Sequence, residues 1–170
     1  MPQRRVAITT GGGDAPGLNA VIRAVVKTGM SRFNMEFVGI EDGFEGLINT
    51  RRISKLNKDA VRGILPKGGT ILGTTNRGNP FEYEITSVDG ETRVSDLSDR
   101  CMENFEALEL EALIAIGGDG TMHIAQRFFE KGLPVIGVPK TIDNDLLATD
   151  VTFGFNTAVT VATEAIDRLH

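Results

Sequence analysis

Two short polar segments in the middle of the chain carry side chains suited to phosphate chemistry. The segment 117–121 places one carboxylate between glycines, and the segment 139–145 holds a cation, a hydroxyl and two carboxylates. These side chains belong to Asp119, Lys140, Thr141, Asp143 and Asp145. Cations and glycine-rich backbone bind phosphate oxygens, whereas carboxylates bind Mg²⁺ or accept a proton from an attacking hydroxyl. The combination favours phosphoryl transfer over other chemistries.

Asp143 and Asp145 are separated by one residue. In an extended loop they face the same side and can share one site. One of them can then accept a hydroxyl proton while the other orients a metal ion or an arginine. Solvated loop residues or a helix cap would explain the same pair. We prefer the functional interpretation because several glycine-rich or acidic loops coincide at one predicted sheet edge.

The elements that must position these side chains are two buried strands. Apolar runs at 113–116 and 135–138 each end where a polar segment begins, and a helical pattern at 121–131 connects them. Ligands bind in open α/β sheets at the carboxyl ends of the strands. His123 lies on the connecting helix, and we interpret it as a surface or packing residue rather than a ligand.

The beginning of the chain repeats this layout. A short strand at 4–9 leads into a loop with three consecutive glycines, and apolar residues recur at helical spacing from Leu18. Strand, glycine loop and helix together form a phosphate-binding arrangement. The spacing matches neither the dinucleotide fingerprint nor the P-loop, so the loop by itself favours phosphate only modestly.

Two further residues have a functional and an ordinary interpretation. Phe44 follows a predicted strand at 37–40, where it can stack on a base or simply pack its loop. Arg77 ends a glycine-rich segment, 67–78, where it can bind a phosphate with its forked guanidinium or remain a solvated charge. Taken alone, each residue favours the ordinary interpretation.

The remaining pattern completes an α/β fold. We predict a short helix at 60–65, a surface hairpin from 83–86 and 91–94, and a helix to about residue 110 capped by Ser95 or Asp96. A strand at 149–154 and an amphipathic helix at 157–169 follow. Alternating strands and helices predict a three-layer αβα sandwich, Rossmann-like, with a mostly parallel sheet and helices on both faces.

Composition limits the possible partners. The chain has 170 residues, a net charge of −5 and scattered basic residues, which argues against nucleic-acid and acidic-membrane binding. Cys101 is the only cysteine. An intrachain disulfide is therefore impossible, and we expect a reducing cytoplasmic location. We see no signal peptide or transmembrane span in the pattern.

Five motifs together resemble one family. They are GGDAPGLN at 12–19, GGTILGTTNR at 68–77, GGDGT at 117–121, PKTIDND at 139–145 and GFNTA at 154–158. In this order they are similar to the N-terminal half of the 6-phosphofructokinases, and the set is highly specific although GGDG alone also occurs in lipid and NAD kinases. The resemblance implies transfer of a phosphoryl group from Mg-ATP to the 1-hydroxyl of fructose 6-phosphate in glycolysis.

The resemblance also implies roles for individual residues. Asp143 would be the base, Asp119 would hold Mg²⁺, and Arg77 would contact the donor phosphates and steady the transferring group. Thr141 and Asp145 would lie beside fructose 6-phosphate and the transferring phosphate. The donor site would be completed by Gly13, Phe44, Gly118, Gly120, Thr121 and Lys140, with Phe44 against adenine.

Two positions point to different phosphoryl donors. Gly120 is the small residue of ATP-dependent members, whereas pyrophosphate-dependent members have an aspartate that blocks the nucleotide α-phosphate. Lys140 is typical of pyrophosphate users. A glycine leaves room for ATP, and a lysine can serve either donor, so we choose ATP.

Family members have about twice this length and a second domain that supplies most of the sugar-phosphate pocket. We therefore expect residues 1–170 to be the nucleotide- and phosphate-binding N-terminal domain, inactive alone and prone to self-association through its open apolar face. The full-length form is expected to be a homo-oligomer with allosteric control. A pyrophosphate-dependent enzyme, a non-catalytic nucleotide-binding module and a lipid- or NAD-kinase relative are the alternatives.

Overall fold

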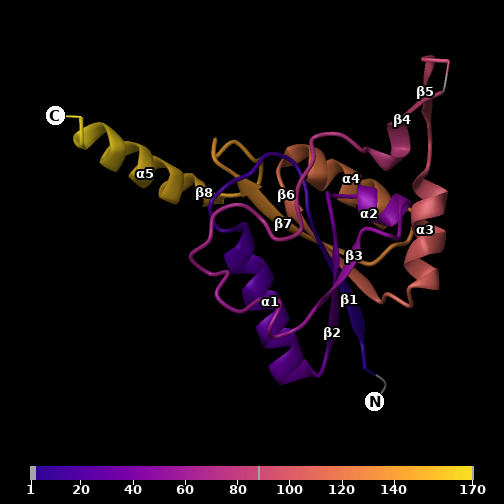
Figure 1. The fold of residues 1–170 in the computed structure, drawn as a ribbon, viewed down its shortest axis with the longest axis horizontal. Coiled ribbons are helices and arrows are strands. Elements are labelled where there is room, and N and C mark those ends of the chain that lie inside the picture. Colours follow the sequence, from indigo (N-terminus) through magenta and orange to yellow (C-terminus); the bar gives the residue numbers. More distant parts are fainter. Residues whose placement is uncertain (1–2, 88, 170) are drawn as a thin grey trace.

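A computed structural model describes residues 3–87 and 89–169 and contains a mostly parallel central sheet (Figure 1). Its six strands lie in the order β3-β2-β1-β6-β7-β8, and only β3 runs antiparallel to its neighbour. The strands are β1 (Arg5–Thr10), β2 (Glu36–Ile40), β3 (Ile53–Leu56), β6 (Ala112–Gly117), β7 (Val135–Thr141) and β8 (Phe153–Gly154). The predicted α/β fold with a mostly parallel sheet is confirmed.

Helices cover both faces of the sheet, as the pattern predicted. One hydrophobic core lies between the sheet and α1, and the other lies between the sheet and α2, α3 and α4. The helices are α1 (Leu18–Phe33), α2 (Glu45–Ile48), α3 (Ser98–Ala107), α4 (Asp119–Glu130) and α5 (Phe155–Asp167). Fully buried side chains such as Ile8 and Leu113 hold the strands at the centre of these cores.

The surface hairpin forms close to its predicted position. It consists of β4 (Tyr83–Thr86) and β5 (Thr92–Ser95), which follow the short helix η1 (Pro80–Glu82). The next helix, α3, ends three residues earlier than expected. Its N-cap residue is Leu97 rather than the predicted Ser95 or Asp96, although the Asp96 carboxylate just before it accepts a hydrogen bond from the Ser98 N–H at 2.8 Å.

Four elements differ from the sequence prediction. Residues 59–63 form turns rather than a helix, since Gly63 adopts a positive φ of 72° and Pro66 disfavours a helical residue before it. The strand predicted at 149–154 is reduced to β8. The antiparallel edge strand β3 and the one-turn helix α2 were not predicted.

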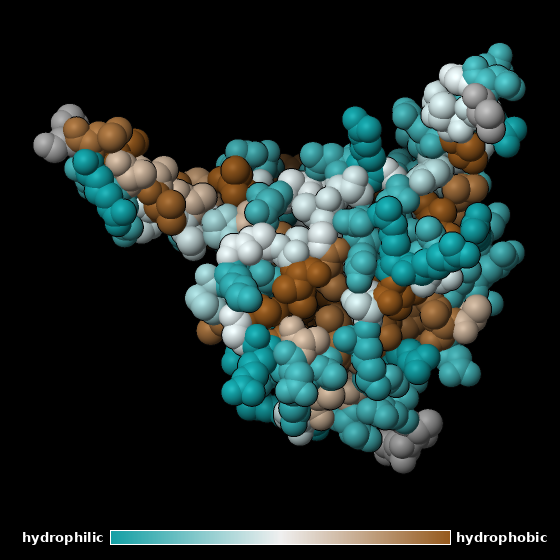
Figure 2. Space-filling model, viewed as in Figure 1, coloured by the Kyte–Doolittle hydropathy of each residue, from teal (hydrophilic) through white to brown (hydrophobic). Residues whose placement is uncertain are grey.

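The last helix, α5, projects from the body of the molecule (Figure 1). It has no buried residue, and its exposed apolar side chains include Val159, Val161 and Ile166. Figure 2 shows the hydrophobic side chains along this helix. Within the described part of the chain, no helix combines the length and apolar character needed to span a membrane.

Candidate phosphate-binding and catalytic site

The candidate site lies at the point where the sheet reverses its strand order. The chain continues from β1 to β2 on one side of β1, and β6 lies on the other side of β1. The loops that leave the carboxyl ends of β1 and β6 therefore lead in opposite directions. Such a switch point is where α/β sheets bind ligands. A cavity of about 470 Å³ occupies this position. It is lined by residues from 11–14, 43–44, 75–79, 118–121, 124, 140–143 and 145.

Every site residue predicted from the sequence lines this cavity. The set comprises Gly13, Phe44, Arg77, Gly118, Asp119, Gly120, Thr121, Lys140, Thr141, Asp143 and Asp145. They come from four loops, the end of β7 and the start of α4, up to 132 positions apart in the chain, counted from Gly13 to Asp145. The fold therefore brings these residues into one cavity. From the sequence we could predict only that most of them follow strands at the same edge of the sheet.

The loop after β1 packs closely against the neighbouring strand and loop. The Gly11 N–H donates to the Ile116 carbonyl at 2.9 Å, and the Gly12 N–H donates to the Thr75 carbonyl at 3.1 Å. A Cβ at position 11 would approach the Thr121 hydroxyl to 2.7 Å, so a larger residue is excluded there. Gly13 has open space around it, which lets a ligand approach its backbone.

Lys140 joins two of the loops from inside. Its side chain is 4% exposed, and its ammonium donates a hydrogen bond to the Gly13 carbonyl. Burial lowers the pKa of Lys140 below its ordinary value, while the negative charges of Asp14 and Asp143 partly oppose this effect. A buried cation at the wall of an open cavity is suited to bind an anionic ligand.

The start of α4 presents a second anion-binding feature. Gly118 precedes the helix and Asp119 and Gly120 begin it, so the free N–H groups of the first turn face the cavity. A Cβ at Gly120 would meet no atom within 4 Å. Position 120 can therefore accept a side chain in the folded protein, and that side chain would enter space available to a ligand.

Asp119 is an exposed carboxylate at the same helix terminus. Its oxygen lies 3.3 Å from the His123 ring nitrogen, and both side chains are exposed, as expected for a surface histidine. Among the residues described, no group of three His, Cys, Asp or Glu side chains converges as a metal site. A single carboxylate fits Mg²⁺ that is held mainly by ligand phosphates and water, the usual arrangement in phosphoryl-transfer sites.

The acidic loop after β7 is ordered by its own side chains. The Thr141 hydroxyl donates to the Asp145 carboxylate at 3.1 Å and accepts from the Asp143 N–H at 3.1 Å. The buried Thr152 hydroxyl donates to the Thr141 carbonyl at 3.1 Å. These bonds leave Asp143 exposed in the cavity with both carboxylate oxygens available.

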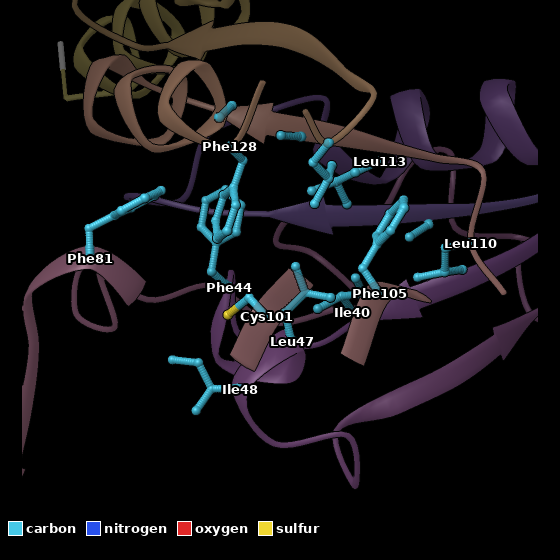
Figure 3. Packing of buried hydrophobic residues seen from close by; sticks show 14 residues of the cluster. Ile40, Phe44, Leu47, Ile48, Phe81, Cys101, Phe105, Leu110, Leu113 and Phe128 are labelled. Carbon is cyan, nitrogen blue, oxygen red and sulfur yellow. The ribbon is translucent and has the colours of Figure 1, made fainter. Parts of the chain in front are cut away.

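Phe44 lines the cavity from a largely buried position. Its ring is 4% exposed and lies 5.5 Å from the ring of Phe128, which in turn lies 4.8 Å from Phe81 (Figure 3). Figure 3 shows these rings together inside the core beside Leu113. With so little exposed surface, the Phe44 ring packs within the core while the residue forms part of the cavity wall. Its contact with adenine stays a prediction.

Several lining residues had no assigned role in the sequence analysis. Among them are Asp14, Thr75, Asn76 and Ile124. Ile124 was detectable, because it lies one helical turn after Gly120 and therefore faces the same side of α4. Thr75 and Asn76 lie in a loop without regular structure, so no periodicity indicated which of its side chains face the cavity.

Comparisons with known proteins identify the family of this chain. The family model described as phosphofructokinase matches residues 5–170. The ATP-dependent 6-phosphofructokinase 2 of Clostridium perfringens is 54% identical over 170 residues, which is all of this chain and 46% of that protein. The pyrophosphate–fructose 6-phosphate 1-phosphotransferase of Streptomyces coelicolor is 52% identical over 167 residues, covering 98% of this chain and 45% of that protein.

Solved structures agree as well. The phosphofructokinase of Pichia pastoris in the T-state superposes with a TM-score of 0.81 at 28% identity, over 99% of this chain and 18% of that one. The chain thus spans less than half the length of the curated relatives that it matches.

Proposed function

Since the chain belongs to the phosphofructokinase family, we propose that its cavity binds the phosphates of Mg-ATP as phosphoryl donor. In a chain of the relatives' full length, the terminal phosphoryl group would pass to the 1-hydroxyl of fructose 6-phosphate. The observation that carries this proposal is the cavity itself. It joins a buried cation, a helix N-terminus and four carboxylates at the switch point of the sheet.

The donor phosphates bind between the glycine loops. Backbone N–H groups at Gly13, Gly118 and Gly120 surround them, and Lys140 neutralises negative charge from the wall of the cavity. Arg77 is exposed at the cavity rim and supplies a second cation with several donors. Positioning and charge neutralisation of this kind provide most of the catalysis in phosphoryl transfer.

The acidic loop serves the acceptor. Asp143 takes the proton of the attacking hydroxyl while the hydroxyl oxygen bonds to the terminal phosphorus and the bond to the bridging oxygen breaks, releasing ADP. Thr141 and Asp145 fix the loop through their mutual hydrogen bond and lie beside the sugar phosphate. Asp119 would hold Mg²⁺, which would supply charge neutralisation on the donor phosphates.

ATP is preferred over pyrophosphate because Gly120 leaves open space at the helix start. An aspartate there would occupy that space and repel a nucleotide α-phosphate. Pyrophosphate is the second candidate, favoured by Lys140 and by the similar identity of the Streptomyces coelicolor relative. A purely nucleotide-binding module is disfavoured because it would need no exposed base at position 143.

We propose that the part of the relatives that this chain does not cover provides the remaining sugar-phosphate contacts. The same part would support assembly into a homo-oligomer. Residues 1–170 alone are expected to bind donor without turnover. A cytoplasmic location follows from the proposed place in glycolysis.

The test is an Asp143→Asn variant in a full-length protein, assayed with ATP and with pyrophosphate. We expect kcat with ATP to fall by about 10²- to 10⁴-fold, the usual contribution of a general base, with little change in donor affinity. Asp150→Asn is the matched control, because Asp150 is exposed nearby but does not line the cavity. Unchanged turnover in Asp143→Asn would refute the assignment of Asp143 as the base. Turnover of the parent protein with pyrophosphate but not with ATP would refute the choice of ATP as donor.

A further inference from the structure

The segment that carries Arg77 has no regular secondary structure. Residues 67–79 contain only turns and bends in the structure, so no ladder of backbone hydrogen bonds fixes their course. Their positions must come from contacts with the rest of the fold. The first of these contacts is a single side chain from the opening turn of α1, Asn19.

Asn19 binds the segment at three points. Its amide nitrogen donates to the carbonyls of Lys67 at 3.1 Å and Gly68 at 3.3 Å. Its amide oxygen accepts from the Ile71 N–H at 2.9 Å. The side chain is 2% exposed, so water cannot replace these bonds. Only a primary amide provides donors and an acceptor in this short planar form.

Further bonds extend this anchoring toward the cavity. The Thr10 hydroxyl lies 2.9 Å from the Thr70 hydroxyl and donates to the Gly73 carbonyl at 2.7 Å. The Gly12 N–H then bonds the Thr75 carbonyl, two residues before Arg77. The segment is thus tied successively to α1, to the end of β1 and to the glycine loop that leads into α1.

We propose that Asn19 is a positioning residue for donor binding. It does not line the cavity and touches no ligand position. Instead it places the segment of Arg77 relative to α1, whose N-terminus follows the loop of Gly13. Asn19 therefore sets the distance between the two loops that hold the donor phosphates. This role rests on the proposed function, since it concerns the binding of that donor.

A merely structural asparagine provides the matched control. Asn104 on α3 donates from its amide to the carbonyls of Leu47 at 2.6 Å and Ile48 at 3.5 Å. It makes the same kind of contact as Asn19, a side-chain amide bound to consecutive backbone carbonyls. It lies in the other core, however, and has no bond to residues 67–79.

The test compares Asn19→Asp with Asn104→Asp. Each change keeps the shape and removes the amide donor. We would measure hydrogen exchange of residues 67–78 in the free protein, and donor affinity by calorimetric titration with Mg-ATP and with Mg-pyrophosphate. We expect Asn19→Asp to speed exchange in this segment and to weaken donor binding, each by about tenfold, equivalent to one hydrogen bond. Asn104→Asp should change the exchange rates of residues 67–78 and the donor affinity by no more than about twofold, even if it lowers the Tm as much as Asn19→Asp does.

Two results would overturn the proposal separately. Unchanged exchange in Asn19→Asp, or equal weakening of donor binding by both variants, refutes the positioning role while the proposed function stands. A parent protein that binds neither donor refutes the proposed function, and the positioning role with it. If Asn19→Asp does not fold, Asn19→Ser is measured by the same criteria, because serine keeps a donor and an acceptor but is too short to reach all three groups.

Discussion

Lys140→Met removes the ammonium from the cavity wall and retains an unbranched apolar stem. In the structure this ammonium is buried, bonds the Gly13 carbonyl and lies near Asp14 and Asp143. The change therefore separates two effects. The protein no longer has to bury a charge, and a phosphate ligand loses its innermost cation.

The two effects have opposite consequences. Burial lowers the pKa of Lys140 despite its acidic neighbours, which means that the charged form is disfavoured by the folded state. Replacing a buried charge by an apolar residue of similar volume is often neutral or stabilising, so we expect Tm to stay constant or rise. A hydrogen bond to a charged group contributes about 1.5–3 kcal/mol, so its loss should weaken donor binding about 10- to 100-fold.

The assay is calorimetric titration with Mg-ATP and Mg-pyrophosphate, combined with thermal unfolding. Lys131→Met is the control, because Lys131 forms an ion pair with Asp99 at 2.6 Å outside the cavity. It should leave donor affinity unchanged. Donor affinity that is equal in Lys140→Met and in the parent would refute the reasoning that this lysine faces the ligand.

The other predictions concern stability. Phe128→Ala should lower the free energy of unfolding by about 3–5 kcal/mol, measured by urea denaturation, because Phe128 is fully buried between Phe44 and Phe81; a loss below 1 kcal/mol would contradict this packing. Burial raises the pKa of the Cys101 thiol from 9.0 to about 12. The buried neutral thiol therefore stabilises the folded state fully below pH 9. As pH rises toward 12 this stabilisation is lost, and the free energy of unfolding falls by up to about 4 kcal/mol. The free energy of unfolding of Cys101→Ala should therefore fall less steeply with pH above pH 9 than that of the parent, and the native thiol should resist modification at pH 8. Equal slopes in the two proteins would contradict the burial of this thiol.

Most helices were predictable because their apolar residues recur at helical spacing, and the central strands because they are short continuous apolar runs that end in glycine-rich or polar loops. The runs at 113–116 and 135–138 became β6 and β7, and their polar loops met at one sheet edge because both strands are parallel to β1. Parallel strand order is a consequence of the strand–helix alternation, so the location of the site followed from it.

The missed elements lack such a period. β3 is four residues long, lies at the sheet edge and alternates too briefly to be distinguished from a loop. The helix predicted at 60–65 failed because a six-residue window cannot overcome the cost of nucleation next to Gly63 and Pro66. Two of its apolar residues, Val61 and Ile64, are buried in the core beside α1, whereas Leu65 is exposed, so the pattern indicated burial only in part and did not give the conformation.

Side-chain contacts between residues that are distant in the chain could not be predicted from the sequence. The bond between Lys140 and Gly13 joins residues 127 positions apart, and the bonds of Asn19 span about 50 positions. Phe44 shows the same limit. Its pattern allowed both stacking and packing, and only its neighbour Phe128, far along the chain, decides that the ring is buried.

The most direct test of the account is the titration of the protein and of Gly120→Asp with Mg-ATP. Position 120 has open space for a side chain, so the variant should fold normally with an unchanged Tm. The account predicts saturable ATP binding to the parent and binding at least about tenfold weaker to Gly120→Asp, with pyrophosphate affected less. Equal ATP affinity in both proteins would contradict the placement of the nucleotide at the start of α4. ATP binding by neither, with pyrophosphate bound by the parent, would contradict the choice of donor.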